Sequence, residues 1–127
     1  MKLITREWIG KAEGDFSTVC RELRARRNPN YDAACFHAQQ CCEKYLKARL
    51  VEAGIEFHKI HDLTLLLDQA LSSEPEWESS REDLAFLTQF GVVFRYPGDS
   101  ADKAMAADAQ QRCVRFRALV RKSFRLP

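Results

Sequence analysis

Apolar residues recur every three or four positions over most of the chain, which is the spacing of one face of an α-helix. The pattern predicts a first amphipathic helix with Thr5 as its N-cap and Glu7 in its first turn. Its apolar face is expected to consist of Trp8, Ala12, Phe16, Val19 and Leu23. The helix should end in the segment RRNPN, because Pro29 disfavours a helical conformation at Asn28.

A second helix is expected from Asp32 to Ala53, and Gly54 is a typical residue just beyond a helix C-terminus. Its inward stripe should be Ala34, Cys35, Ala38, Cys42, Tyr45 and Leu46. One polar face of this helix carries residues three or four positions apart, namely His37, Gln40, Lys44 and Lys47. Gln39 and Glu43 lie beside that face.

Two further helices are predicted in the middle of the chain. The third runs from about Asp62 to Leu71 and is capped by Asp62 or His61. The fourth runs from about Arg81 to Phe94 and is mostly apolar, and the acidic segment SSEPEWESS between the two is expected to be a loop.

A last helix follows a turn at Pro97 and Gly98. Asp99 or Ser100 is expected to cap it, and it should reach about Phe124. Its inward positions are expected to be Ala104 or Met105, then Ala109, Cys113, Phe116 and Val120.

These elements predict an all-α fold, because strand-like alternation never extends beyond a few residues. Short connections favour antiparallel neighbours, which gives an up-and-down four-helix bundle with an additional short helix. With 127 residues, the chain is expected to form a single helical domain over residues 1–127. The run from Leu84 to Phe94 is more hydrophobic than one four-helix core needs, so we expect it to contact a second copy in a homodimer.

Charge and cysteine content narrow the choice of function. The net charge of +2 gives no overall field that would mark a nucleic-acid or membrane binder. After Asp108 the chain contains basic residues and no acids. We interpret this basic stretch as a solvated helix face, and a surface for an anionic partner is the alternative. The five cysteines show no disulfide spacing, and no apolar run is long enough to cross a bilayer. We therefore expect a reducing, cytoplasmic location and no membrane partner.

Known metal, cofactor and nucleophile motifs do not occur in the sequence, so no metal, cofactor or catalytic residue is predicted. His37 and Cys41 are spaced to share a metal, but the chain offers no obvious second pair of zinc ligands. His58 and His61, with Asp62, allow a role as ligands or as a base, and capping or loop anchoring explains them as well.

The polar face of the second helix concentrates positive charge at Lys44 and Lys47. An i,i+4 pair between Glu43 and Lys47 on a solvated face is the simpler interpretation.

The segment FRYPGDSADKA, residues 94–104, joins the fourth and last predicted helices. Arg95 offers a planar fork of donors suited to phosphate, and Tyr96 offers a ring on which a base can stack. The N-terminus of the following helix would add unpaired N–H groups. An Arg95–Asp99 ion pair beside an ordinary turn explains the same residues, and the sequence leaves both interpretations open.

Three sequence segments resemble the HEPN domain family (higher eukaryotes and prokaryotes nucleotide-binding): DAACFHAQQCCEKYLKARLVEAGIEF, HDLTLLL and FRYP. The similarity extends over nearly the whole chain, and AQQCCEKYLKA, HDL and RYP are its most specific parts. The resemblance implies a dimeric helical bundle of a prokaryotic protein that is often encoded beside a minimal nucleotidyltransferase. Such pairs include toxin–antitoxin systems, in which the helical subunit is thought to bind a nucleotide or another substrate.

Many HEPN proteins are ribonucleases in which a histidine follows an arginine at a short spacing. Arg95 matches the arginine, but Ser100 occupies the corresponding later position and no histidine follows His61. The usual proton acceptor near neutral pH is therefore missing from this segment. The resemblance assigns nucleotide- or anion-binding roles to Arg95, Tyr96, Asp99, Lys44, Lys47, Gln40 and His61.

The leading hypothesis is a nucleotide- or nucleic-acid-binding module that acts as the non-catalytic partner of a minimal nucleotidyltransferase. One alternative is a ribonuclease toxin in which Arg95 acts with Asp99, Tyr96 or His61 in place of the missing histidine. The other alternative is a purely structural interaction subunit.

Overall fold

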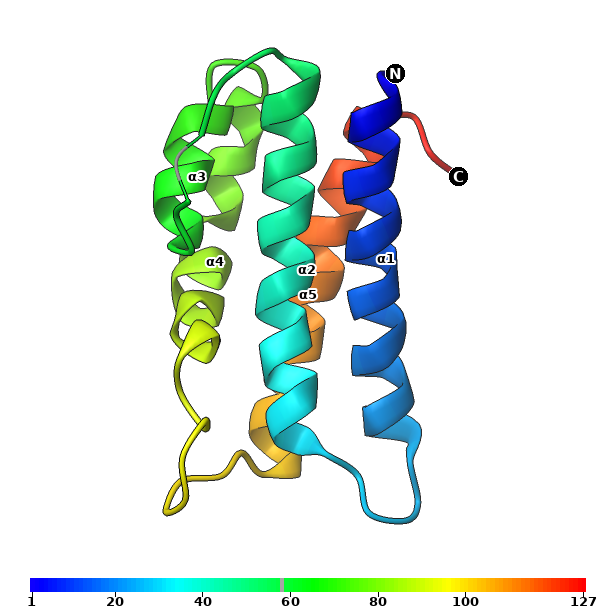
Figure 1. Ribbon diagram of the computed structural model, residues 1–127, viewed down its shortest axis with the longest axis vertical. Coiled ribbons are helices and arrows are strands. Elements are labelled where there is room, and N and C mark those ends of the chain that lie inside the picture. Colours follow the sequence, from blue (N-terminus) through cyan, green and yellow to red (C-terminus); the bar gives the residue numbers. More distant parts are fainter. Residues whose placement is uncertain (58) are drawn as a thin grey trace.

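The computed structural model describes residues 1–57 and 59–127, and every regular element in this part of the chain is helical (Figure 1). The elements are α1 (Leu3–Arg24), α2 (Tyr31–Glu52), α3 (Leu63–Ala70), η1 (Pro75–Ser80), α4 (Arg81–Thr88), η2 (Gln89–Gly91) and α5 (Lys103–Ser123), where η marks a 3₁₀-helix. The predicted all-α fold is confirmed. His58, for which the sequence left several roles open, lies outside the described residues.

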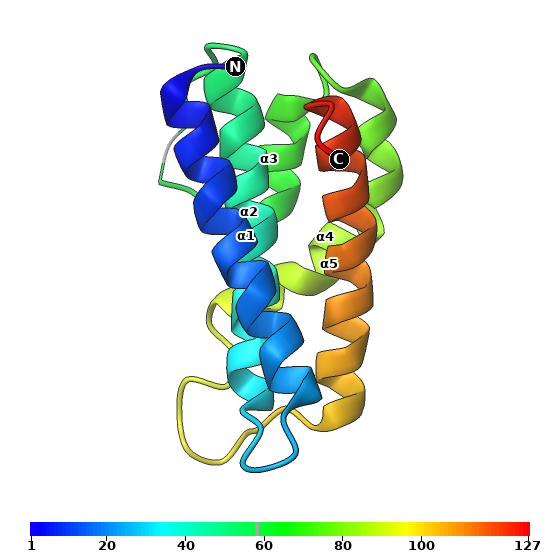
Figure 2. The same ribbon diagram turned by 90° about the vertical axis from the view of Figure 1, so that its right-hand side faces the viewer.

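The four helices α1, α2, α4 and α5 alternate in direction, and α3 is the additional short helix (Figure 1). α2 is central, because it contacts α1, α3, α4 and α5. Figure 2 shows that the two termini lie at one end of the bundle, whereas the α1–α2 and α4–α5 connections lie at the other. Within the described residues, we find no helix with the length and apolar character that a membrane crossing requires.

The predicted core stripe of α2 is confirmed, since its members are fully buried: Ala34, Cys35, Ala38, Cys42, Tyr45 and Leu46. All five cysteines have free thiols, and the four on α2 and α5 are buried. Burial raises the pKa of Cys41 and Cys42, so these thiols stay protonated and pack as small apolar groups.

The boundaries of α2 and α3 agree closely with the prediction. The Asn30 side chain accepts a 2.9 Å hydrogen bond from the amide of Ala33 and caps α2. Asp62 caps α3, and Gly54 beyond α2 has φ +72°, a backbone conformation that glycine adopts without steric strain.

The predicted N-cap of the first helix is wrong. α1 begins at Leu3 and its N-cap residue is Lys2. The hydroxyl of Thr5 is buried and donates a 2.8 Å hydrogen bond to Glu52 in the last turn of α2. Thr5 therefore joins two helices instead of starting one.

The predicted N-cap of the last helix is also wrong, because Asp102 rather than Asp99 or Ser100 caps α5. The Asp102 side chain accepts a 2.8 Å hydrogen bond from an amide in the first turn of α5. Just before it, the Ala101 amide donates a 2.7 Å hydrogen bond to Asp32 Oδ1 on α2. The hydrogen bond of Ala101 ties the α4–α5 connection to α2, and α5 begins after this residue.

The segment SSEPEWESS is not the loop that the sequence predicted, since η1 occupies most of it. Pro75 begins η1 with a φ angle that suits a helix start. Trp77 is fully buried, and its ring packs edge-on against Phe116 of α5 with centroids 5.2 Å apart. A segment that appears polar in sequence thus contributes the largest buried side chain of the core.

The fourth helix is shorter than predicted. α4 ends at Thr88, and η2 continues the chain to Gly91. Phe94 then has φ +69°, a left-handed conformation through which an α-helix cannot continue.

The apolar run from Leu84 to Phe94 is divided between the core and the surface, and Phe86 and Phe94 are half-buried against the core. Leu84, Leu87 and Phe90 are buried, whereas Val92 is 67% exposed. The core of one chain therefore explains three positions of the run, and contact of the remaining apolar side chains with a second copy stays a prediction.

The basic residues of α5 are mostly paired with acids. Arg117 and Arg121 both contact Glu13 of α1, and Arg112 and Arg115 both contact Asp83 of α4. The basic face that we expected to be solvated is in fact joined to neighbouring helices. These pairs weaken the alternative interpretation as a surface for an anionic partner.

Candidate functional site

A pocket of about 350 Å³ lies between α2, the start of α3 and the end of α4. It is lined by Gln40, His61, Asp62, Thr88, Gly91, Val92 and Arg95. Three of the predicted site residues thus line one pocket, although they come from separate segments of the chain: Gln40, His61 and Arg95.

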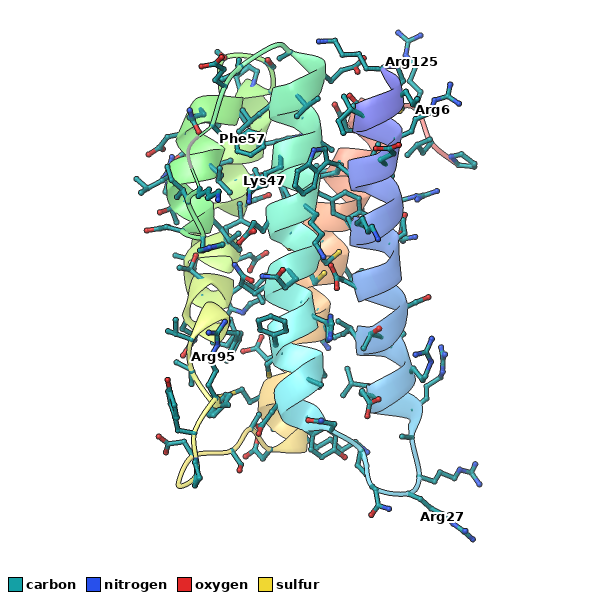
Figure 3. All side chains as sticks on the ribbon, in the orientation of Figure 1. Arg6, Arg27, Lys47, Phe57, Arg95 and Arg125 are labelled. Carbon is teal, nitrogen blue, oxygen red and sulfur yellow. The ribbon has the colours of Figure 1, made fainter. Side chains whose placement is uncertain are left out.

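Arg95 is exposed and supplies the positive charge of this pocket. Across residues 1–57 and 59–127, no carboxylate forms an ion pair with it, so the predicted alternative of an Arg95–Asp99 pair does not form. The guanidinium carbon lies 5.9 Å from the ring centroid of Phe36 on α2, which is within the range of a cation–π contact. Figure 3 places Arg95 on the segment after α4, beside α2.

The backbone at Phe94 sets the direction in which Arg95 leaves the bundle. Its left-handed conformation is unfavourable by about 1–2 kcal/mol for a residue with a side chain. Its ring stacks on Phe90, with centroids 5.9 Å apart and planes 22° apart, and this packing offsets the strain. The chain therefore turns sharply just before the arginine.

His61 is held by the side chains of α2. Its Nδ1 lies 3.0 Å from Glu43 Oε1, and its main-chain oxygen accepts a 3.2 Å hydrogen bond from Gln39. The Asp62 side chain accepts a 2.9 Å hydrogen bond from the Thr64 amide, so the next residue is fixed as a helix cap. The imidazole is nevertheless 72% exposed.

Glu43 is the centre of this cluster and is only 4% exposed. It accepts hydrogen bonds from Lys47 at 3.0 Å and from Gln39 at 3.1 Å. Burial alone raises the pKa of the Glu43 carboxyl, but hydrogen bonds from Lys47, Gln39 and His61 and the Lys47 charge lower the pKa below its usual value. The carboxylate is therefore charged at neutral pH.

The expected Glu43–Lys47 pair forms, but the solvated face on which we placed it is wrong. Lys47 is buried, and its ammonium nitrogen lies 5.7 Å from the centroid of Trp8 and 5.4 Å from that of Phe57. Figure 3 shows Lys47 and Phe57 nearer the end of the bundle that holds the termini, away from Arg95. Lys47 acts on the pocket only through Glu43.

Lys44 is directed towards α1 instead of the pocket. Its ammonium group lies 2.7 Å from Asp15 Oδ2, and His37 Nδ1 lies 2.7 Å from the other oxygen of the same carboxylate. Asp15 is 7% exposed, so it serves as a buried anchor for both side chains. His37 borders a second pocket, which Arg95 also lines.

Comparison with known proteins identifies the family. The sequence from residue 5 to residue 123 matches the model of the HEPN domain. The chain belongs to the HEPN family. The solved structure of ST0689, an archaeal HEPN homologue, has a TM-score of 0.75 and 25% sequence identity to this chain, and the match covers 96% of this chain and 98% of the other. No match was found among curated proteins.

Besides Lys44 and Lys47, two further site residues predicted from the HEPN resemblance do not line the pocket, namely Tyr96 and Asp99. Tyr96 is 79% exposed, and Asp99 lies in the exposed turn before α5. The sequence prediction placed both beside a helix N-terminus, but α5 begins only at Lys103. Tyr96 and Asp99 therefore do not adjoin the helix N-terminus that was expected to bind an anion together with Arg95.

The pocket also contains residues that the sequence analysis did not select, namely Thr88, Gly91 and Val92. They lie at the end of α4, which the sequence predicted to continue as a buried helix. Gly91 inside that apolar run was the available signal, because glycine weakens a helix interior.

Proposed function

We propose that this HEPN chain binds a nucleotide or single-stranded RNA, with a ligand phosphate at Arg95. Membership of the HEPN family supports a module related to nucleotides or RNA. The observation that carries the specific proposal is an exposed arginine without a carboxylate partner in the described chain, at the edge of a pocket. A guanidinium in this state has donors free for a phosphate.

The walls of the pocket supply complementary polar groups. The Gln40 amide nitrogen donates a 2.7 Å hydrogen bond to Gln39, so the amide oxygen is the part of Gln40 left to accept from a ribose or base. Thr88 already accepts from the Leu63 amide and donates to the Leu84 oxygen. Thr88 therefore shapes the wall, whereas Arg95 and Gln40 supply recognition.

The proposal retains two partners that the family resemblance implies. One is a minimal nucleotidyltransferase, with which the chain would form a toxin–antitoxin pair. The other is a second copy of this chain, for which the exposed side chain of Val92 beside the pocket is the available part of the apolar run. Binding of the ligand at Arg95 requires neither partner.

Replacing Arg95 with alanine is expected to weaken binding of ATP, GTP or a short RNA by roughly 10- to 100-fold. The reason is that a hydrogen bond to a charged group contributes about 1.5–3 kcal/mol. Titration calorimetry of the wild type and R95A with each ligand measures the change. The matched control is R6A, which removes the same charge from an exposed residue at the opposite end of the bundle (Figure 3).

The nucleotide proposal fails if the wild type and R95A bind all three ligands equally, or if neither binds any of them. In that case, the purely structural interaction subunit becomes the better description. Equal weakening in R95A and R6A would point to a general charge effect instead of a site.

A further inference from the structure

Another pocket, of about 460 Å³, is bordered by α1 and α2. Its lining residues are Ile4, Glu7, Trp8, Lys11 and Lys44. Ile4, Trp8 and Lys11 are spaced four and three positions apart, so they lie on one face of α1. We call this feature the Trp8 pocket, and we call the pocket lined by Arg95 and Gln40 the Arg95 pocket.

The indole of Trp8 is held in place but remains partly open to solvent. Lys47 Nζ lies 5.7 Å from the centroid of the indole, and the ring of Phe57 packs edge-on against it with centroids 6.2 Å apart. The part of the indole that these contacts leave open borders the pocket. An aromatic ring in this state is a platform on which an unpaired base can stack.

The charged groups around the indole are complementary to a nucleotide. Glu7 and Lys11 are exposed, and across residues 1–57 and 59–127 neither forms an ion pair. Glu7 can therefore accept a hydrogen bond from an amino group of a base, and Lys11 can contact a phosphate. Lys44 is held at 2.7 Å by Asp15, so it forms a fixed wall of the pocket.

The two pockets are neighbours along α2. Gln40 lines the Arg95 pocket and Lys44 lines the Trp8 pocket, and these two residues are one helical turn apart, about 6 Å along the axis. Figure 3 shows Lys47, which contacts Trp8, nearer than Arg95 to the end of the bundle that holds the termini. A strand with a phosphate at Arg95 can thus follow α2 towards that end and place another of its bases beside the indole.

We propose that the Trp8 pocket binds a base of a single-stranded RNA whose phosphate is bound at Arg95, and that Glu7 favours a base with an exocyclic amino group. The inference rests on the proposed binding of a ligand phosphate at Arg95. It goes further because it identifies the ligand as a strand of several nucleotides, adds a second subsite and assigns a base preference to that subsite.

An apolar side chain of a second copy is the other occupant that an indole could contact. Two observations favour the base. An apolar side chain would cover the carboxylate of Glu7 and the ammonium of Lys11 without pairing them, and burial of an unpaired charge is costly. The Trp8 pocket also shares α2 with the Arg95 pocket, so a strand bound at Arg95 supplies the base.

The test compares ATP, which occupies the Arg95 pocket alone, with a short single-stranded oligoadenylate, which reaches both pockets. W8L keeps an apolar side chain but removes the stacking ring. We expect W8L to bind the oligoadenylate about 10-fold more weakly than the wild type and to bind ATP with unchanged affinity. W8F retains a ring and should retain most of the affinity for the oligoadenylate, whereas R95A should weaken the binding of both ligands.

Tryptophan fluorescence gives a direct readout of stacking on the indole. The chain has two tryptophans, and Trp77 is fully buried, so quenching by a bound base reports on Trp8. We expect the oligoadenylate to quench the emission of the wild type, ATP to leave it unchanged, and W8L to show no quenching.

Cytosine and uracil separate the role of Glu7 from stacking, because both are pyrimidines and only cytosine has an exocyclic amino group. We expect the wild type to bind oligocytidylate about 5-fold or more tightly than oligouridylate, and E7Q to lose this preference. E82Q is the matched control, since it makes the same change at an exposed glutamate of α4 outside both pockets, and it should keep the preference.

The outcomes separate this inference from the proposed function. Equal binding of the oligoadenylate by W8L and the wild type, or a wild type whose emission is not quenched, overturns the Trp8 subsite, and weaker ATP binding by R95A would leave the Arg95 site intact. If R95A weakens neither ligand, the proposed function and this inference fail together. Equal affinity for the two pyrimidine oligomers overturns the role of Glu7. Emission of Trp8 that changes with protein concentration instead of with RNA assigns the pocket to a second copy and overturns the proposal.

Discussion

Replacing Lys47 with methionine is expected to destabilise the protein by about 3 kcal/mol at neutral pH. Methionine has a similar length and still covers the rings of Trp8 and Phe57. The change leaves the buried carboxylate of Glu43 without its cation. Chemical denaturation followed by circular dichroism measures the difference in the free energy of unfolding.

The double variant E43Q/K47M is the matched control. It removes both charges and keeps the volume of both side chains, so most of the lost stability should return. A double variant as unstable as K47M would show that the loss comes from packing instead of the unpaired carboxylate.

The pH dependence of the K47M stability gives an independent check that the loss comes from the unpaired charge of Glu43. In the wild type, the pKa of Glu43 is lowered in the folded state, so its contribution to stability is present above the unfolded pKa and is lost as pH falls through the folded pKa. In K47M, burial is no longer opposed by the lysine, and protonation relieves the unpaired charge. The stability difference between the two proteins should therefore narrow between about pH 7 and about pH 4.

Replacing Trp77 with alanine is expected to destabilise the protein by about 3–5 kcal/mol. Trp77 is fully buried, and its edge-on contact with Phe116 joins η1 to α5. Denaturant titration of W77A measures the loss, and W77F should lose less because it retains an aromatic ring. The control E76A changes an exposed neighbour in the same segment and should stay within about 0.5 kcal/mol of the wild type.

A W77A variant no less stable than E76A would contradict the assignment of η1 to the core. This comparison is informative because the sequence analysis placed both residues in a loop. The comparison of W77A with E76A distinguishes the effect of burying the indole from an effect that any substitution in the acidic segment would have.

The sequence predicts helices well where one apolar stripe decides them. The predicted stripe of α2 repeats at helical spacing, so the burial of its six members followed from spacing alone. α2 also buries six residues outside that stripe, namely Gln39, Cys41, Glu43, Lys47, Ala48 and Leu50. Trp77 is different, because it is a single apolar residue among acids and has no periodic neighbours. Its burial depends on Phe116, which is distant in sequence, and local patterns carry no information about such a partner.

The N-cap of α5 illustrates a second limit. Asp99, Ser100 and Asp102 are all suitable cap residues within four positions of each other. The structure uses Asp102, and Ala101 beside it is hydrogen-bonded to Asp32 on α2. The contact between Ala101 and Asp32 joins segments that are distant in sequence, so the sequence alone did not decide which residue caps α5.

The candidate site was partly predictable for a related reason. The family resemblance selected Arg95, Gln40 and His61, and the structure places them around one pocket. The role of Glu43 could not be derived from spacing, because its contact with His61 depends on the path of the chain between α2 and α3. The available signal for this role was the position of Glu43, an acid between Gln39 and Lys47 on the polar side of a core helix.

The central claim is that the pocket beside Arg95 holds the ligand, and amide chemical-shift mapping tests it most directly. Titration with a short single-stranded oligoribonucleotide should shift the amides of Gln40, Thr88, Gly91 and Arg95 most strongly, and in R95A the shifts at the first three should be much smaller at the same ligand concentration. Shifts that gather instead at the exposed arginines of the α1–α2 connection, or shifts that persist unchanged in R95A, would contradict the account.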